Sequence, residues 1–391
     1  ALVGGLAGSG TSIAITNCSS SGDITITNIS GSGMPSLNFA GGLVGYILSA
    51  TTITSSHASG NVSGGYEFTG GLVGYAENST ISYSSASGGV TNGYYTGGLV
   101  GYATNLTILY SNAIGNVTGD QETGGLVGRL ANSTVSYSTA SGDVTGTRLT
   151  GGLVGYAPGS TISKSSASGD VLGHEYTGGL IGEAYLSTNI ADSFSTGEVM
   201  GTDRVGGLVG DARVTISITR SFSTGNVTGS GDYIGGLAGL SYDSSFTNTF
   251  ATGDISGNLY IGGLIGDANT DTDILYSFAT GTLSGTNHLG ELAGRSDGAT
   301  YTDNYFANDQ GTVDAIGTNL SSGDVNPAGT TGATLAQLQC PTMADDIGCT
   351  GKTLYANWID SIWNFGNNAQ LPGLIIDGTI YRDGDANGIL D

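Results

Sequence analysis

Apolar and polar residues alternate along most of this chain in a pattern that returns at a nearly constant interval. The clearest landmark is the leucine of a Gly-Gly-Leu segment, which recurs every 27 to 29 residues after a first interval of 37. Its copies are Leu6, Leu43, Leu72, Leu99, Leu126, Leu153, Leu180, Leu208, Leu237, Leu264 and, in the variant Gly-Glu-Leu, Leu292. A period of this length is typical of solenoids and other repeat arrays. The unit is too short for a four-stranded propeller blade, so it suits one coil of a β-helix.

A second landmark is the glycine that ends each Ser-Ala-Ser-Gly-like segment. Its copies are Gly22, Gly60, Gly88, Gly115, Gly142, Gly169, Gly197, Gly225, Gly253 and Gly281. The residue two positions after it is always aliphatic, the residue two before it is Ala or Ser, and the residue four before it is almost always Ser or Thr. Residues at odd offsets vary. Because strand side chains alternate between two faces, the constant even positions are predicted to fill a lumen. The sequence therefore predicts an all-β fold, a β-solenoid of about eleven coils of 27–29 residues.

Three local expectations follow from this alignment. The inward serines should hydrogen-bond from coil to coil, because a buried hydroxyl without a partner is costly. Cys18 falls in the serine row, so we expect a buried, unreactive thiol. Glycines at the corners should supply positive φ where the chain turns.

Composition and charge narrow the class of partner. The chain of 391 residues has 71 glycines and a formal net charge of -23, which disfavours nucleic acid and anionic membrane surfaces. No apolar run approaches the length that crosses a bilayer, so no membrane insertion is expected. Cys340 and Cys349 bracket a short loop that a disulfide would close, which favours an oxidising compartment. Two free thiols are the alternative.

Some outward rows have distinctive side chains. Three residues before the glycine landmark, the later coils carry Phe194, Phe222, Phe250 and Phe278. These phenylalanines predict either an exposed interface for self-association or a row covered by residues 304–391. One residue before the glycine stands a row of Ser and Thr, which suggests ice binding as a minor alternative to a solubilising surface. Tyrosines on several coils are candidates for stacking on sugars or are ordinary strand residues: Tyr46, Tyr75, Tyr83, Tyr102, Tyr110, Tyr137 and Tyr156.

Few residues point to catalysis. The three histidines occupy different coil positions, and the His174–Glu175 dipeptide is expected to be solvated. Candidate carboxylates for a polysaccharide-cleaving enzyme are expected to lie on differing rows: Asp192, Asp211, Asp254 and Asp267. We therefore predict that the protein is not an enzyme.

The final residues resemble a calcium-binding loop. Asp383, Asp385, Asn387 and Asp391 stand at positions 1, 3, 5 and 9 of such a loop, and Gly388 stands at the position of its sharp turn. The pattern predicts a Ca²⁺ site, although the chain ends before the usual last carboxylate. An acidic terminal linker is the alternative.

The segments GGLVGYA, GGLVGRL, GGLIGEA and GGLAGLS, each followed by a serine-rich strand, resemble the GLUG-motif repeats of large bacterial surface and secreted proteins. The resemblance covers about residues 1–308. The stretch from Trp358 to Leu374 is similar to a W…WxFG…YPxL segment that closes such arrays, with Leu371 in place of the tyrosine. The resemblance implies a right-handed parallel β-helix on an extracellular protein, and it implies no known catalytic activity.

These observations together predict a solenoid over residues 1–303, a C-terminal cap over 304–376 and an acidic calcium-loop-like tail over 377–391. The predicted function is a secreted or cell-surface, non-enzymatic structural or adhesive solenoid, either a section of an adhesin or a filament subunit. Its expected partners are other copies of itself, or a host or cell-surface glycan or protein. A carbohydrate-binding or carbohydrate-cleaving β-helix is the alternative.

Overall fold

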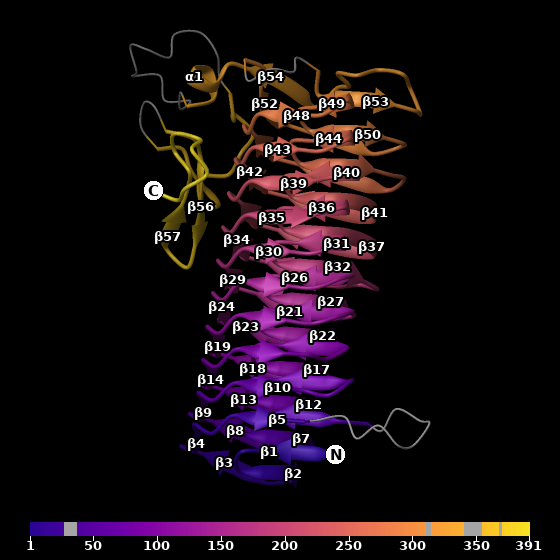
Figure 1. The fold of residues 1–391 in the computed structure, drawn as a ribbon. Helices are drawn as coiled ribbons and strands as arrows, with labels where there is room; N and C mark the ends of the chain where they lie inside the picture. Colours follow the sequence, from indigo (N-terminus) through magenta and orange to yellow (C-terminus); the bar gives the residue numbers. More distant parts are fainter. Residues whose placement is uncertain (27–36, 310–313, 340–353, 367–369) are drawn as a thin grey trace. The chain divides into compact units, whose positions relative to one another are not determined.

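The computed structural model describes residues 1–26, 37–309, 314–339, 354–366 and 370–391. The chain divides into two compact units, unit 1 (residues 1–189) and unit 2 (residues 190–391). Both are built of short parallel β-strands stacked coil upon coil (Figure 1). Among the described residues the helix is the single turn α1 (Leu335–Leu338), which begins with a capping box of Thr334 and Gln337. No helix in this part of the chain is long and apolar enough to cross a membrane.

Each coil of unit 1 contributes strands to four faces. The first face comprises β1 (Leu2–Gly4), β6 (Phe39–Gly41), β11 (Phe68–Gly70), β16 (Tyr95–Gly97), β21 (Glu122–Gly124), β26 (Leu149–Gly151) and β31 (Glu175–Gly178). The second begins with β2 (Ala7–Thr11), β7 (Val44–Leu48), β12 (Val73–Glu77), β17 (Val100–Thr104), β22 (Val127–Ala131), β27 (Val154–Pro158) and β32 (Ile181–Tyr185). It continues after a bend with β3 (Ala14–Thr16), β8 (Thr52–Thr54), β13 (Thr80–Ser82), β18 (Thr107–Leu109), β23 (Thr134–Ser136) and β28 (Thr161–Ser163).

Two faces of very short strands close each coil of unit 1. The third comprises β4 (Ser19–Ser20), β9 (His57–Ala58), β14 (Ser85–Ala86), β19 (Asn112–Ala113), β24 (Thr139–Ala140) and β29 (Ser166–Ala167). The fourth comprises β5 (Ile24–Thr25), β10 (Val62–Ser63), β15 (Val90–Thr91), β20 (Val117–Thr118), β25 (Val144–Thr145) and β30 (Val171–Leu172). β33 (Asn189–Ala191) spans the boundary between the units.

Unit 2 repeats the same faces. The first comprises β36 (Asp203–Gly206), β40 (Asp232–Gly235), β44 (Leu259–Gly262) and β49 (Asn287–Gly290). The second comprises β37 (Val209–Thr219), β41 (Ala238–Thr247), β45 (Ile265–Ala268), β46 (Thr272–Leu275), β50 (Ala293–Ser296), β51 (Thr300–Thr302) and β53 (Ile316–Asn319). The third comprises β34 (Phe194–Ser195), β38 (Phe222–Ser223), β42 (Phe250–Ala251), β47 (Phe278–Ala279), β52 (Asn304–Ala307) and β54 (Thr330–Ala333), and the fourth β35 (Val199–Gly201), β39 (Val227–Gly229), β43 (Ile255–Ser256) and β48 (Leu283–Ser284).

Equivalent residues of successive coils lie directly opposite one another. Val62 aligns with Val90, and Val90 aligns with Val117, in parallel register. The aliphatic residues fill the lumen, where Leu72 and Ile81 have no exposed surface. The predicted fold class, a right-handed parallel β-helix, is thus confirmed. β52, β53 and β54 extend the coil pattern to Ala333, beyond the boundary expected at residue 303.

The inward serines form the expected ladder. In unit 1 the backbone N–H of Ser84 donates to Oγ of Ser111 at 3.2 Å, and the N–H of Ser111 donates to Oγ of Ser138 at 3.2 Å. Each hydroxyl donates within its own coil, as Ser111 Oγ does to the Leu109 carbonyl at 2.8 Å. Every serine is therefore both donor and acceptor, which removes the penalty for burying it. Cys18 lies in this row but is only half-buried, because it belongs to the first coil.

The expectation that the repeat glycines supply positive φ is wrong. Positive φ occurs in the described chain at seven glycines, none of them in either landmark. The corner residues with φ near +50° are instead Asn17, Ser55, Tyr83, Tyr110, Tyr137, Lys164, Asp192, Arg220, Asn248 and Tyr276. The repeat glycines are needed for close packing, since a Cβ on Gly88 would overlap the carbonyl oxygen of Gly60 in the neighbouring coil.

A C-terminal cap (described residues 354–366 and 370–391) packs on the third face of unit 2. It contains the antiparallel sheet β55 (Trp363–Asn364), β56 (Gly373–Ile376) and β57 (Thr379–Tyr381). Its buried side chains, including Trp358 and Trp363, join the phenylalanines of the solenoid in one apolar cluster. The start of the segment expected as an acidic tail therefore belongs to the cap.

Candidate binding groove

Two rows of aromatic side chains line the outside of unit 1 where the first face meets the second. One row comes from β6, β11 and β16, and the other from β7, β12 and β17. Together they form the aromatic groove: Phe39, Tyr46, Phe68, Tyr75, Tyr95 and Tyr102. All six are half-buried, and a pocket opens at the first of these coils between Phe39, Tyr46, Phe68 and Tyr75. The groove is a direct product of the repeat, because parallel register places each ring beside its equivalent in the next coil.

The rings of the groove hold one another in place. Within the rows, neighbouring rings stack with centroids 4.9 to 5.1 Å apart. Across the groove the pairs Phe39–Tyr46, Phe68–Tyr75 and Tyr95–Tyr102 meet edge to face at 5.2, 5.4 and 5.2 Å. Both arrangements are favourable for aromatic rings. Burial, reinforced by nearby Glu77, raises the pKa of Tyr75 well above its ordinary value, so its hydroxyl stays a hydrogen-bond donor at physiological pH.

An ion pair continues both rows of the groove. Glu122 aligns with Tyr95, and Arg129 aligns with Tyr102. Arg129 Nη1 lies 3.0 Å from Glu122 Oε1, and its guanidinium lies over the rings of Tyr102 and Tyr156 at 5.4 and 4.8 Å. Burial raises the pKa of Glu122 to about 7, although Arg129 opposes this shift.

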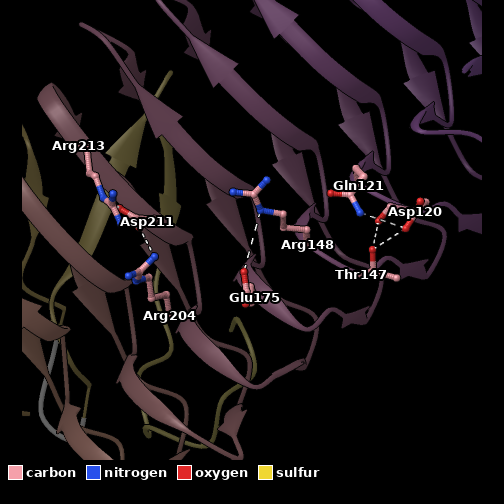
Figure 2. A network of polar contacts seen from close by, with 8 residues as sticks. All are labelled: Asp120, Gln121, Thr147, Arg148, Glu175, Arg204, Asp211 and Arg213. Atoms are coloured by element: carbon pink, nitrogen blue, oxygen red, sulfur yellow. Dashed lines mark hydrogen bonds and ion pairs between the residues drawn. The ribbon is translucent and has the colours of Figure 1, made fainter.

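A polar pocket adjoins these coils. The Arg148 pocket is lined by Gln121, Thr147, Arg148, Leu172, His174 and Glu175, among other residues. Thr147 Oγ1 donates to Asp120 Oδ1 at 2.8 Å, and Gln121 Nε2 donates to the same oxygen at 3.3 Å (Figure 2). Arg148 Nε stands 4.0 Å from Glu175 Oε2, and both side chains are half-exposed. His174 and Glu175 are exposed as expected, but they share a pocket with a guanidinium.

In unit 2 the first-face row carries stacked rings, with Tyr233, Tyr260 and His288 at centroid distances of 5.3 and 5.0 Å, whereas the second-face row carries charges on several coils. Arg213 binds both carboxylate oxygens of Asp211, at 2.7 and 2.5 Å (Figure 2). Arg204 Nη1 lies 3.7 Å from Oδ2 of the same carboxylate. Asp267 pairs with Arg295 at 3.0 Å. Asp211 and Asp267 both align with Leu240, so the expectation that they lie on differing rows is wrong. Burial raises the pKa of both carboxyl groups, although an arginine beside each opposes the shift.

The other two candidate carboxylates lie elsewhere. Asp192 stands at a corner of unit 2, where Arg220 binds both its oxygens at 2.5 and 2.7 Å. Asp254 is exposed and accepts the backbone N–H of Thr282 at 2.9 Å. These two residues therefore join neither each other nor the row of Asp211 and Asp267.

The phenylalanine row of unit 2 is not a free surface. Phe222, Phe250 and Phe278 have no exposed area, and with Phe194 they form a stack with centroids 4.6 to 5.1 Å apart. The C-terminal cap covers them, with Trp363 packed on Phe250 and Phe278. Of the two alternatives drawn from the sequence, the covered row is the one present in the structure, because the cap supplies apolar side chains to match it. The neighbouring Thr224, Thr252 and Thr280 are also buried, so this part of the hydroxyl row has no ice-facing surface.

The residues of the expected calcium loop form a tight turn. Asp383 is buried, and its carboxylate accepts the N–H groups of Asn387 and Gly388 at 2.9 and 2.8 Å. Asp391 accepts the N–H of Gly384 at 2.8 Å, and Asp385 accepts Nδ2 of Asn387 at 3.0 Å. In the described chain no group of three His, Cys, Asp or Glu residues is placed to hold a metal. As placed, these carboxylates do not fit a shared ion, and the calcium site stays a prediction.

Two further expectations concern the cysteines and the remaining tyrosines. Cys340 and Cys349 lie outside the described residues. Tyr83, Tyr110 and Tyr137 are exposed and stack at 5.0 and 4.7 Å, so their faces meet one another along the stack. The Lys164 ammonium lies over the Tyr137 ring at 5.0 Å and continues this row.

Sequence reasoning missed half of the groove. Phe39, Phe68 and Tyr95 each stand seven residues before a tyrosine of the Val-Gly-Tyr segment, and Glu122 stands seven before Arg129. This spacing was the signal that linked the two rows, but only the bend between the first and second faces makes them meet.

The comparisons with known proteins agree with the repeat. The family model of the GLUG motif matches residues 66–91, 119–145 and 146–172, all within unit 1. No curated protein and no solved structure matches the chain. These three matched segments contain coils of the groove and of the Arg148 pocket. Unit 1 of this chain therefore contains GLUG-motif repeats.

Proposed function

We propose that this protein is a non-enzymatic, extracellular β-solenoid of structural and adhesive function, and that the aromatic groove of unit 1 is its contact surface. It is either a section of a bacterial surface adhesin or a subunit of a surface filament. The observation that carries the proposal is the groove itself, six half-exposed rings fixed by stacking on a regular coil.

Rigid aromatic rows favour binding for a physical reason. A side chain already held by its neighbours loses little conformational entropy when a ligand arrives. Tyrosine hydroxyls add hydrogen-bond donors beside an apolar surface, a combination common in recognition sites. The adhesin form has more support than the filament form, since the phenylalanine row that favoured self-association is covered by the cap.

Carbohydrate is the partner class that we favour, and cleavage of carbohydrate is the rival activity. The proposal is tested on a glycan array with the wild-type protein and the double variant Tyr75→Ser/Tyr102→Ser. We expect binding to at least one glycan class, reduced at least tenfold in the variant. The matched control is Tyr83→Ser/Tyr110→Ser, which removes exposed rings of the same unit outside the groove and should change affinity by less than twofold.

Three outcomes would contradict the proposal. Equal binding by the groove variant and the wild type would remove the groove as the contact surface. Release of reducing sugar from a bound glycan would replace adhesion by hydrolysis. Immunogold labelling of the producing cells tests the location, and label confined to the cell interior would contradict an extracellular role.

A further inference from the structure

We propose that the Arg148 pocket binds the carboxylate of an acidic sugar, of the uronic-acid class, within a glycan that lies along the aromatic groove. This inference rests on the proposed adhesive function and names the ligand class that the same surface selects. Its basis is the unusual setting of one guanidinium in a very acidic chain.

Arg148 is held more loosely than the other arginines that pair with carboxylates. Arg129, Arg213, Arg220 and Arg295 each lie within 2.5 to 3.0 Å of a carboxylate oxygen, and Arg204 lies 3.7 Å from one. Arg148 stands 4.0 Å from Glu175, which is beyond hydrogen-bonding distance, and about half of each side chain is exposed. Its planar, forked guanidinium lines a pocket, and its carboxylate partner is not close enough for a hydrogen bond.

The walls around Arg148 suit a sugar ring better than a simple anion. Leu172 is an exposed apolar side chain on one wall, and the Arg148 guanidinium lies 5.6 Å from the Tyr176 ring centroid. Thr147 and Gln121 add a hydroxyl and an amide to the lining, and both donate to Asp120 (Figure 2). A carboxylated pyranose offers a carboxylate for Arg148, an apolar face for Leu172 and hydroxyls for the polar wall.

The pocket lies beside the strands that continue the first-face row of the aromatic groove. Gln121 immediately precedes Glu122, and Arg148 immediately precedes Leu149, while Glu122 and Leu149 continue the row of Phe68 and Tyr95. A glycan that follows the rings along the coils thus reaches Arg148 after the last aromatic pair. The aromatic groove supplies contact area, and the pocket supplies selection by charge.

Glu175 is the competitor for the ligand carboxylate. At 4.0 Å in a solvent-exposed setting the Arg148–Glu175 pair is weak, so a bidentate contact from a ligand is a favourable exchange. The net charge of -23 repels an acidic glycan at long range. Moderate salt screens this repulsion more than it weakens a direct contact in the pocket. Affinity for the acidic ligand should therefore rise between low and physiological ionic strength.

The test uses two probes that differ at the carboxyl group, an oligogalacturonate and its uncharged, fully methyl-esterified counterpart, with calorimetry on the full chain. We expect the wild type to bind the acid at least fivefold more tightly than the ester at physiological salt. Arg148→Gln should abolish this preference by weakening acid binding at least fivefold, and Glu175→Gln should strengthen acid binding. Lys164→Gln, which removes an exposed cation of unit 1 outside the pocket, is the matched control and should keep the preference. Circular dichroism of each variant verifies the fold.

The failure of this inference is distinguishable from that of the proposed function. Equal affinity of the wild type for acid and ester, or an unchanged preference in Arg148→Gln, would overturn the pocket assignment and leave an adhesive groove for neutral glycans. Binding of neither probe, together with a silent glycan array, would overturn both proposals.

Discussion

Units 1 and 2 have the same kind of interior but differ in the residues on their outer faces. In both units, serine or threonine ladders and aliphatic columns fill the lumen, and the same corner residue has a left-handed backbone. On the third face, unit 1 exposes Ser85 and Asn112 at least partly, whereas unit 2 buries Phe222 and Phe250 under the cap. Both units have stacked rings on the outside of the first face, but on the second face unit 1 has tyrosines where unit 2 has the ion-paired Asp211 and Asp267. The interior thus specifies the solenoid, and the outward positions are free to specify what each unit contacts.

The largest expected effect concerns the cap of unit 2. Trp363→Ala removes a buried indole that packs on Phe250 and Phe278 and donates to Asn248 Oδ1 at 2.9 Å. We expect a loss of about 3–5 kcal/mol from unit 2. This loss of stability is measured in thermal melts that are monitored with a dye that binds exposed apolar surface. An unchanged melt, or a loss confined to unit 1, would show that the cap does not stabilise the phenylalanine row.

The next effect tests whether the two interiors are equivalent. Gly88→Ala in unit 1 and Gly225→Ala in unit 2 each place a Cβ against a carbonyl oxygen of the neighbouring coil, Gly60 and Gly197 respectively. Both should cost about 1–3 kcal/mol or more through overpacking. Gly89→Ala is the adjacent control, because its Cβ has no neighbour closer than 3.4 Å. If Gly89→Ala is as harmful as Gly88→Ala, close packing is not the reason for the glycine.

A third prediction concerns pH and is specific to unit 1. The pKa of Glu122 is raised to about 7, so between about 4.5 and 7 the folded state binds a proton that the unfolded state releases. The contribution of the Glu122 carboxyl to stability is fully present at low pH and is lost as the pH rises through about 7. We expect the free energy of unfolding of the wild-type protein to be lower at pH 8 than at pH 5 by on the order of 1–3 kcal/mol. Glu122→Gln should flatten this profile; a profile that stays as steep would assign the pH dependence to other groups.

The smallest expected effect concerns the exposed tyrosine row of unit 1. Tyr110→Ser removes the ring between Tyr83 and Tyr137. Because these rings are exposed, we expect a loss of about 0.5–1.5 kcal/mol, well below that of Trp363→Ala. A loss as large as that of the tryptophan variant would mean that exposed and covered rows contribute alike, and the comparison between the units would fail.

The interior was predictable because it is periodic. The offsets of Leu72, Ser84 and Val90 repeat coil after coil, and the two-residue alternation of a strand assigns them to the lumen. The role of the glycines was not predictable in the same way. A glycine in a sequence is consistent with positive φ or with the close approach of another backbone segment. Only the stacked backbones show that Gly88 faces Gly60. The row of Asp211 and Asp267 was readable from the sequence, because each stands three residues after a leucine of the first landmark.

The candidate sites were predicted less completely than the fold. Tyr46, Tyr75 and Tyr102 of the groove were recognised, but Phe68 and Arg129 were not, since their partners come from another face of the coil. Arg148 was missed as well, because its partner Glu175 stands on the next coil. The phenylalanine row was recognised, but whether it is free depends on where the distant Trp358 and Trp363 pack.

The sequence by itself determined the repeat, the coil and the inward columns, since each of these is a local property of spacing and alternation. The tertiary structure alone decided which outward rows meet across a bend, which row the cap covers and which arginine lacks a close carboxylate. The physical reason is that burial and pairing of outward side chains depend on segments far away in the chain, and no period in the sequence encodes that distance.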